Sequence, residues 1–156
     1  MKRFLIIFVL LFTALCFTGC SCNNKKKVAE TYDCTYWLVS RGTTGLNILK
    51  NDDGTDVYSY YQLLFYNDQT FQLVFLLNGA EKAEVYAGTF TEQVNDGVKT
   101  RYLKYYNKPD ELQNLYGDTP YVVNGNTLER HQHQVSGASD SYTDTVISQT
   151  FVKSSK

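Results

Sequence analysis

The clearest strand-like apolar pattern in the chain lies between Tyr60 and Leu77, where two apolar runs are joined by the polar pair Asn67 and Asp68. Asn and Asp adopt left-handed backbone angles more readily than most residues, so they favour a tight turn. In the second run hydrophobic side chains recur at every other residue, at Phe71, Leu73, Phe75 and Leu77. This pattern predicts a β-hairpin, which we take as the nucleus of an all-β domain.

The length of the hairpin loop decides which side chains of the first arm face the core. A three-residue loop, Asn67 to Gln69, places Phe65 opposite Phe71 and matches apolar with apolar across the strands. A two-residue loop would place Leu64 opposite Phe71, a poorer match that we rank second. The opposite face is also apolar, which predicts either a covering layer or a patch for membrane or partner contact. The preferred register predicts an interior, ligand-binding surface of Leu63, Phe65, Phe71, Leu73 and Phe75.

Shorter segments with a similar alternation follow, separated by turn signals rich in Asn, Asp and Gly. The segment 108–117 differs, because acidic residues after Pro109 and a closing Gly117 are typical of one or two helical turns. We therefore predict an all-β fold, an eight-stranded antiparallel meander barrel with one short helix, and keep a two-sheet sandwich as the alternative. A long connection or a ragged hairpin covers 41–56. The predicted strands are 35–39, 62–66, 70–77, 83–93, 99–106, 121–124, 127–135 and 142–153.

The start of the chain has the features of a secretory leader. Lys2 and Arg3 precede an apolar run over 4–12 that is shorter than the roughly 20 helical residues needed to span a bilayer. The next segment, Phe17-Thr18-Gly19-Cys20, resembles the bacterial lipobox, although aliphatic residues are usual at the position of Phe17. The resemblance implies cleavage before Cys20 and acylation of its sulfur. An uncleaved signal anchor is the alternative.

This leader sets the predicted domain boundaries: 1–19 is a lipoprotein signal peptide, 20–33 a lipidated tether and 34–156 the barrel domain. Two acyl chains with neighbouring basic residues form a stable membrane anchor, and three lysines occupy 25–27. These lysines could equally serve only to solvate the linker. We expect the protein to lie in the cell envelope, anchored by lipid to a bacterial membrane at the outer membrane or the cell surface.

Charge is unevenly distributed along the chain. Five of the 15 basic residues precede Val28, which leaves ten against all 16 acidic residues and a net charge of about −6 for the remainder. Phosphate binding requires a basic patch. Lys99, Arg101 and Lys104 are too few, and tyrosines are interleaved with them. The composition therefore argues against nucleic acid as a partner.

Four cysteines are present, and two of them are assigned by the leader. Cys16 leaves with the signal peptide, and Cys20 carries the lipid. Cys22 and Cys34 remain, and an exported compartment permits them to form a disulfide; two free thiols, or mixed partners through Cys22, are the alternatives. Their spacing does not match a zinc site, and no histidine is nearby.

Glu129, His131 and His133 alternate along one predicted strand, so they share one face and offer a carboxylate and two imidazoles to a divalent metal. The other face of this strand is polar too, with Arg130, Gln132 and Gln134, so we favour a solvated strand and predict no metal site. Paired carboxylates occur at Asp52-Asp53 and Asp110-Glu111, where turn formation and helix capping explain them.

Several short motifs, taken in order, resemble the lipocalin-like (calycin) domain of small bacterial lipoproteins. The resemblance rests on Trp37-Leu38-Val39, Leu64-Phe65 followed by Gln69-Thr70-Phe71, Gly88-Thr89-Phe90, Gly125-Asn126-Thr127-Leu128 and Phe151-Val152-Lys153. It implies a barrel in which Trp37 anchors the closed end beneath the last strand. Members of such families include binders of apolar molecules, so the resemblance supports an architecture more strongly than a function.

Two functions therefore compete. The first is a lipid-anchored protein that holds a small apolar or amphiphilic ligand at the mouth of its barrel. The second is a non-enzymatic envelope interaction protein, an inhibitor or adhesion module that binds a protein or glycan. We predict no enzymatic activity and no cofactor, because the sequence has no nucleophile motif, phosphate-binding loop or dinucleotide fingerprint. We expect a monomer.

Overall fold

The computed structural model describes residues 26–41, 43–106, 120–136 and 143–155. All eight predicted strands are present in these ranges, and a ninth, β2, lies within the predicted long connection. The described ranges contain no helix that could cross a membrane. The strands are β1 (Val28–Arg41), β2 (Thr44–Asn47), β3 (Tyr58–Tyr66), β4 (Thr70–Leu77), β5 (Glu84–Asn95), β6 (Val98–Tyr105), β7 (Tyr121–Asn124), β8 (Thr127–Ser136) and β9 (Thr143–Lys153).

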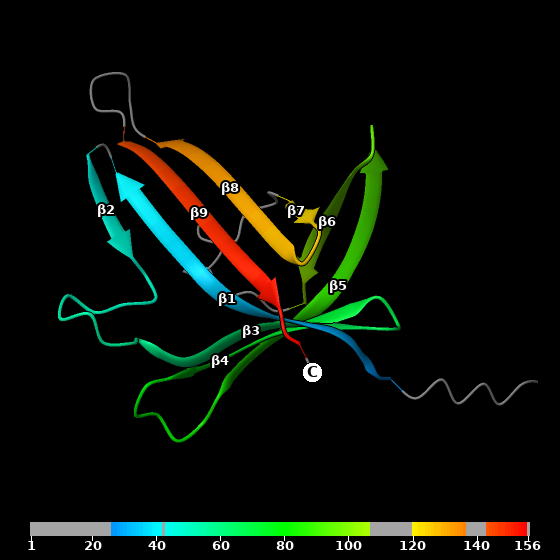
Figure 1. Ribbon diagram of the computed structural model, residues 1–156, viewed down its shortest axis with the longest axis horizontal. Coiled ribbons are helices and arrows are strands. Elements are labelled where there is room, and N and C mark those ends of the chain that lie inside the picture. Colours follow the sequence, from blue (N-terminus) through cyan, green and yellow to red (C-terminus); the bar gives the residue numbers. More distant parts are fainter. Residues whose placement is uncertain (1–25, 42, 107–119, 137–142, 156) are drawn as a thin grey trace, which may run out of the picture.

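Eight of these strands form a closed antiparallel barrel (Figure 1). Strands β3 to β9 follow one another around the wall, and β1 pairs with both β3 and β9 to close it. The end of β1 also pairs with β2, from Leu38 opposite Asn47 to Arg41 opposite Thr44, so β2 is an extra strand outside the ring. Closure pairs each strand of the ring with a neighbour on both sides over at least part of its length. The predicted all-β barrel is confirmed.

The hairpin of β3 and β4 has the predicted register. Phe65 lies opposite Phe71 and Leu63 opposite Leu73, so the loop comprises Asn67, Asp68 and Gln69. Asp68 stabilises this loop, because its Oδ1 accepts hydrogen bonds from the amide and the hydroxyl of Thr70 at 3.1 and 2.6 Å. Gln69 takes the left-handed conformation, with φ of 62°. Local turn chemistry and apolar pairing therefore favour the same register.

Strand β1 is longer than predicted. It begins at Val28, so residues 28–33, which we assigned to the tether, belong to the barrel wall. Its register against β9 shifts between Cys34 and Tyr36, which makes Thr35 the extra residue of a β-bulge. Because the bulge changes the phase of the alternation, Tyr32 and Trp37 both face the interior, although strict alternation would place them on opposite faces.

The two ends of the barrel differ in their connections. The turn end carries the short turns 67–69, 96–97 and 125–126, together with the start of β1 and the end of β9. The loop end carries the connections between β1 and β2, β2 and β3, and β4 and β5. The predicted helix over 108–117 falls between β6 and β7, outside the described residues.

Gly88 on β5 lets two neighbouring strands approach closely. An added Cβ there would lie 2.0 Å from the carbonyl oxygen of Lys104 on β6 and 2.7 Å from the ring of Phe71 on β4. Only glycine fits this position without movement of the backbone. The Gly88-Thr89-Phe90 motif therefore marks a point where β4, β5 and β6 pack closely.

Candidate functional site

The interior face of the central hairpin is a packed core. Leu63, Phe65, Phe71 and Leu73 face inward as predicted, and each side chain is only 0–1% exposed. Phe75 also packs against this core but is partly exposed. Ligand contact at the five positions stays a prediction, and Phe75 alone among them has exposed surface to offer.

A row of stacked aromatic rings crosses β3, β4 and β5 toward the loop end. Tyr61 stacks on Phe75 with ring centres 5.2 Å apart, and Phe75 stacks on Tyr86 at 6.0 Å. Tyr58 meets Phe75 edge-on at 5.6 Å. Tyr58, Phe75 and Tyr86 are partly buried, so this aromatic row presents some apolar surface.

Polar side chains from β7, β8 and β9 face the same interior. Tyr121 donates its hydroxyl to Oε1 of Gln149 at 3.1 Å, and Nε2 of Gln149 lies 3.9 Å from the sulfur of Cys34. Arg130 donates from Nη2 to Oε1 of Gln132. Arg130 and Gln149 are each only 1% exposed. We call Tyr121, Arg130, Gln132 and Gln149 the polar wall.

The polar wall was not predicted from the sequence. We interpreted Arg130 and Gln132 as part of a solvated strand face, and the structure corrects this, because both are buried in the barrel. Both faces of β8 carry polar side chains, so the alternation along this strand does not show which face lies inside the barrel and which faces solvent. Burial raises the pKa of Tyr121, against the opposing effect of the Arg130 charge, and burial raises the pKa of Tyr105 well above its usual value. Both phenols therefore remain neutral hydrogen-bonding groups at physiological pH.

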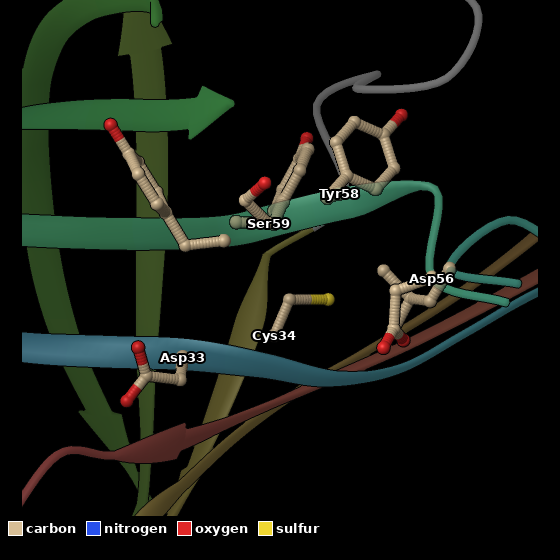
Figure 2. Close-up of a pocket in the computed structure, with 8 residues that line it drawn as sticks. Asp33, Cys34, Asp56, Tyr58 and Ser59 are labelled. Atoms are coloured by element: carbon tan, nitrogen blue, oxygen red, sulfur yellow. The ribbon is translucent and has the colours of Figure 1, made fainter. Parts of the chain in front are cut away.

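A gap opens in the wall between β1 and β3. Pairing of these strands stops at Asp33 opposite Gln62, and the register of β3 against β4 shifts near Ser59. Figure 2 shows the side chain of Cys34 between the two strands, close to this gap. A crevice of about 280 Å³ lies here, and Asp33, Cys34 and Asp56 are among its lining residues. Bulges on both strands explain why the wall opens at this level.

Cys34 forms no disulfide within the part of the chain that the structure describes. Burial raises the pKa of its thiol to about 12, although hydrogen bonds involving Gln149 and the backbone of Tyr36 oppose the shift. The thiol is therefore protonated and a poor nucleophile at neutral pH. Cys22 lies outside the described residues, so the pairing of Cys22 with Cys34 stays a prediction.

The turn end holds a buried cation that sequence reasoning missed. Arg101 on β6 donates from Nε to Oε1 of Glu92 at 2.6 Å and from Nη2 to Oε2 of Glu30. Its guanidinium carbon lies 4.4 Å from the ring centre of Phe65 and 5.5 Å from that of Phe90. The ion pairs and the ring faces together compensate for burial of the charge.

Two lysines complete this Arg101 cluster. Lys153 lies 2.8 Å from Glu30, and Lys99 lies 2.7 Å from Glu92. Burial would raise the pKa of both carboxyl groups, but hydrogen bonds from the lysines and from Arg101 outweigh burial and hold both pKa values below the usual range. A crevice of about 560 Å³ lies beside the cluster. The carboxylates of Glu30 and Glu92 are therefore each paired with two cations at the turn end.

The histidine pair lies on the outside of β8, as predicted. His131 and His133 are exposed, and Nδ1 of His131 lies 3.2 Å from the hydroxyl of Ser148. Among the described residues, no group of three or more His, Cys, Asp or Glu side chains is arranged to hold a metal ion. Asp53 has the predicted turn role, since its Oδ1 accepts hydrogen bonds from the amide and hydroxyl of Thr55.

Trp37 is buried, as predicted, but it lies on the loop-end side of the β1 bulge. Its ring centre is 5.2 Å from that of Tyr61. Tyr32 and the Arg101 cluster occupy the turn end in its place. The predicted lipidation site Cys20 and the carboxylate pair at 110–111 lie outside the described residues.

Comparison with known proteins gives no match: no family model fits the chain, and no curated protein or solved structure is significantly similar to it.

Proposed function

We propose that the protein is an envelope lipoprotein, anchored by lipid at Cys20, whose barrel binds a small amphiphilic molecule at its loop end. The observation that carries this proposal is the division of the interior into two unlike surfaces. The aromatic row lines one side, and the polar wall lines another. A ligand with a flat apolar body and a polar group matches both surfaces better than a purely apolar ligand does.

The depth of the ligand follows from packing. Leu63, Phe65, Phe71 and Leu73 are buried and fill the middle of the interior, so we expect the ligand to lie between the loop end and Phe75. Gln132 on β8 and Thr145 on β9 are each 9% exposed and are polar groups that could meet such a ligand. An eight-stranded barrel has room for one small ligand at most. We therefore expect one site with a single molecule bound.

The test is titration of the purified protein with an anionic fluorescent amphiphile, 8-anilinonaphthalene-1-sulfonate, alongside native mass spectrometry of protein taken from its own membrane. Phe75→Ala should weaken binding about tenfold or more, because it removes the central ring of the aromatic row. Leu76→Ala is the matched control, since it changes the outer face of the same strand. Equal affinity in the two variants would exclude binding at the aromatic row.

A second candidate, the envelope interaction protein, is favoured by the filled core and by two exposed tyrosines beside the wall gap. Tyr36 and Tyr60 are 46% and 38% exposed. Tyrosine is enriched at binding interfaces because it combines apolar area with a polar tip. Loss of partner or glycan capture in Tyr36→Ala, with amphiphile binding unchanged, would favour this function over ligand binding.

The anchor is tested separately. Cys20→Ala should abolish incorporation of a fatty-acid probe and release the protein from the membrane fraction, whereas Cys22→Ala should change neither. Continued labelling of Cys20→Ala would refute lipidation at this position.

A further inference from the structure

The segment that precedes β1 joins the barrel at the turn end, and hydrogen bonds hold it in place there. The amide of Lys27 donates to Oδ1 of Asn67 at 3.0 Å, and the amide of Asn67 donates to the carbonyl oxygen of Lys27 at 3.1 Å. The ammonium group of Lys26 lies 4.2 Å from the ring centre of Tyr66. These contacts tie the N-terminal segment to the β3–β4 turn. Cys20 is therefore within about 20 Å of the turn end, even along a fully extended chain.

The β5–β6 hairpin projects at this same end of the barrel. Pairing of β4 with β5 stops at Thr70 opposite Thr89, whereas pairing of β5 with β6 continues to Asn95 opposite Val98. The hairpin thus extends roughly 20 Å past the last β4–β5 pair at the usual strand rise. Figure 1 shows its tip on the side of the molecule from which the N-terminal segment departs. Val94 and Val98 at the tip are 66% and 49% exposed.

Charge differs between the two ends. At the turn end, Glu30 and Glu92 are engaged by cations of the Arg101 cluster. Lys26 and Lys27 are exposed there beside the tether and offset the exposed Asp68 and Asp96 of the turns 67–69 and 96–97. At the loop end, the connections 48–57 and 78–83 carry Asp52, Asp53, Asp56 and Glu81 against Lys50 and Lys82. An anionic lipid surface therefore attracts the turn end relative to the loop end.

We propose that the turn end rests on the lipid surface, with the tip of the β5–β6 hairpin in contact with the headgroup region. This inference rests on the proposed anchor at Cys20. Two valines are too little apolar surface to bind a membrane alone. A short tether holds the two valines near the lipid at an effective concentration of order millimolar. Even weak binding of the hairpin tip to the membrane surface is then occupied for a substantial fraction of the time. The loop end then opens away from the membrane, and its ligand arrives from the aqueous side.

The test measures which end meets lipid. Val94→Trp and Leu46→Trp place a tryptophan at the hairpin tip or on exposed β2 at the loop end, and the buried native Trp37 adds the same background to both. Each lipoprotein is reconstituted into phosphatidylethanolamine–phosphatidylglycerol vesicles brominated near the headgroups. Val94→Trp should lose its added emission by bromine quenching, whereas Leu46→Trp should keep it. Equal quenching of both, or of neither, would overturn the proposed orientation.

A second arm separates the orientation from the anchor. The same variants with Cys22→Ser are coupled through Cys20 to a maleimide lipid in these vesicles, since the buried Cys34 thiol is protonated and reacts slowly. Flotation of uncoupled lipoprotein with vesicles reports on acylation. Quenching in the coupled protein reports on orientation, whether or not cells acylate Cys20. The loss of one signal with retention of the other identifies which proposal has failed.

Discussion

Replacement of Arg101 by methionine tests whether the Arg101 cluster stabilises the barrel by electrostatics. The arginine side chain is 5% exposed, while Glu30 and Glu92 are 23% and 32% exposed. Two charge-assisted hydrogen bonds, each about 1.5–3 kcal/mol, must be discounted for this solvent exposure, and the contact with Phe65 adds about 1 kcal/mol. Methionine keeps the apolar stem. We expect Arg101→Met to lower the free energy of unfolding by about 2–4 kcal/mol at pH 7.

The stability difference between wild type and Arg101→Met should change with pH in a defined direction. Because the pKa values of Glu30 and Glu92 lie below their usual 4.5 in the folded protein, their stabilising contribution is complete above the unfolded pKa. It disappears as the pH falls through the lowered folded values. The difference between wild type and Arg101→Met should therefore be largest near pH 7 and shrink below about pH 4.5.

Urea denaturation followed by fluorescence of the buried Trp37 measures this difference between pH 7 and pH 3. Lys104→Met is the matched control, because Lys104 lies on the exposed face of the same strand and its loss should change stability by less than about 0.5 kcal/mol. A penalty for Arg101→Met that is the same at both pH values would refute the electrostatic reasoning. A penalty as small as that of Lys104→Met would show that the cluster behaves as a surface ion pair.

Three further predictions follow from packing. Gly88→Ala should cost about 3 kcal/mol or prevent folding, because its methyl group would meet the Lys104 carbonyl, whereas Gly45→Ala meets only side-chain atoms at 3.4 Å and should leave the melting temperature nearly unchanged. Trp37→Ala should lower the free energy of unfolding by about 3–5 kcal/mol, measured by urea denaturation, and an unchanged midpoint would show that the indole is not part of the core. Cys34 should react with iodoacetamide far more slowly at pH 8 in the folded protein than in urea, and equal rates would contradict its burial.

The hairpin could be predicted because its local signals agree. Turn residues at Asn67 and Asp68, alternation in β4 and apolar pairing of Phe65 with Phe71 all indicate one register. The positions of the other strands followed from similar turn signals. The start of β1 was missed, because the bulge at Thr35 breaks the alternation that would have joined Tyr32 to Trp37. A single extra residue hides such a strand from a period-two analysis.

The interior polar groups were missed for a different reason. Arg101 is followed by Tyr102 and Lys104 on β6, and Arg130 lies between Glu129 and His131 on β8, so neither local sequence marks its arginine as buried. The partners that make Arg101 buriable, Glu30 and Glu92, lie on β1 and β5. Only the closed topology brings these groups together. Polar interiors of this kind are set by long-range pairing, which no local pattern in the sequence reports.

The pairing of β1 with β9 also governs how the chain reaches its native state. Thr35 and Thr150, 115 positions apart, are joined by a hydrogen bond across this seam. Ribosomes deliver the N-terminal strand first, so the ring stays open until synthesis of the final strand is complete, and such distant contacts slow folding. A truncation before β9 would leave β1 and β8 as bare edges that template aggregation. The barrel therefore closes only when β9 pairs with β1. Premature stop codons within β9 should abolish accumulation of folded protein rather than yield a stable shorter barrel.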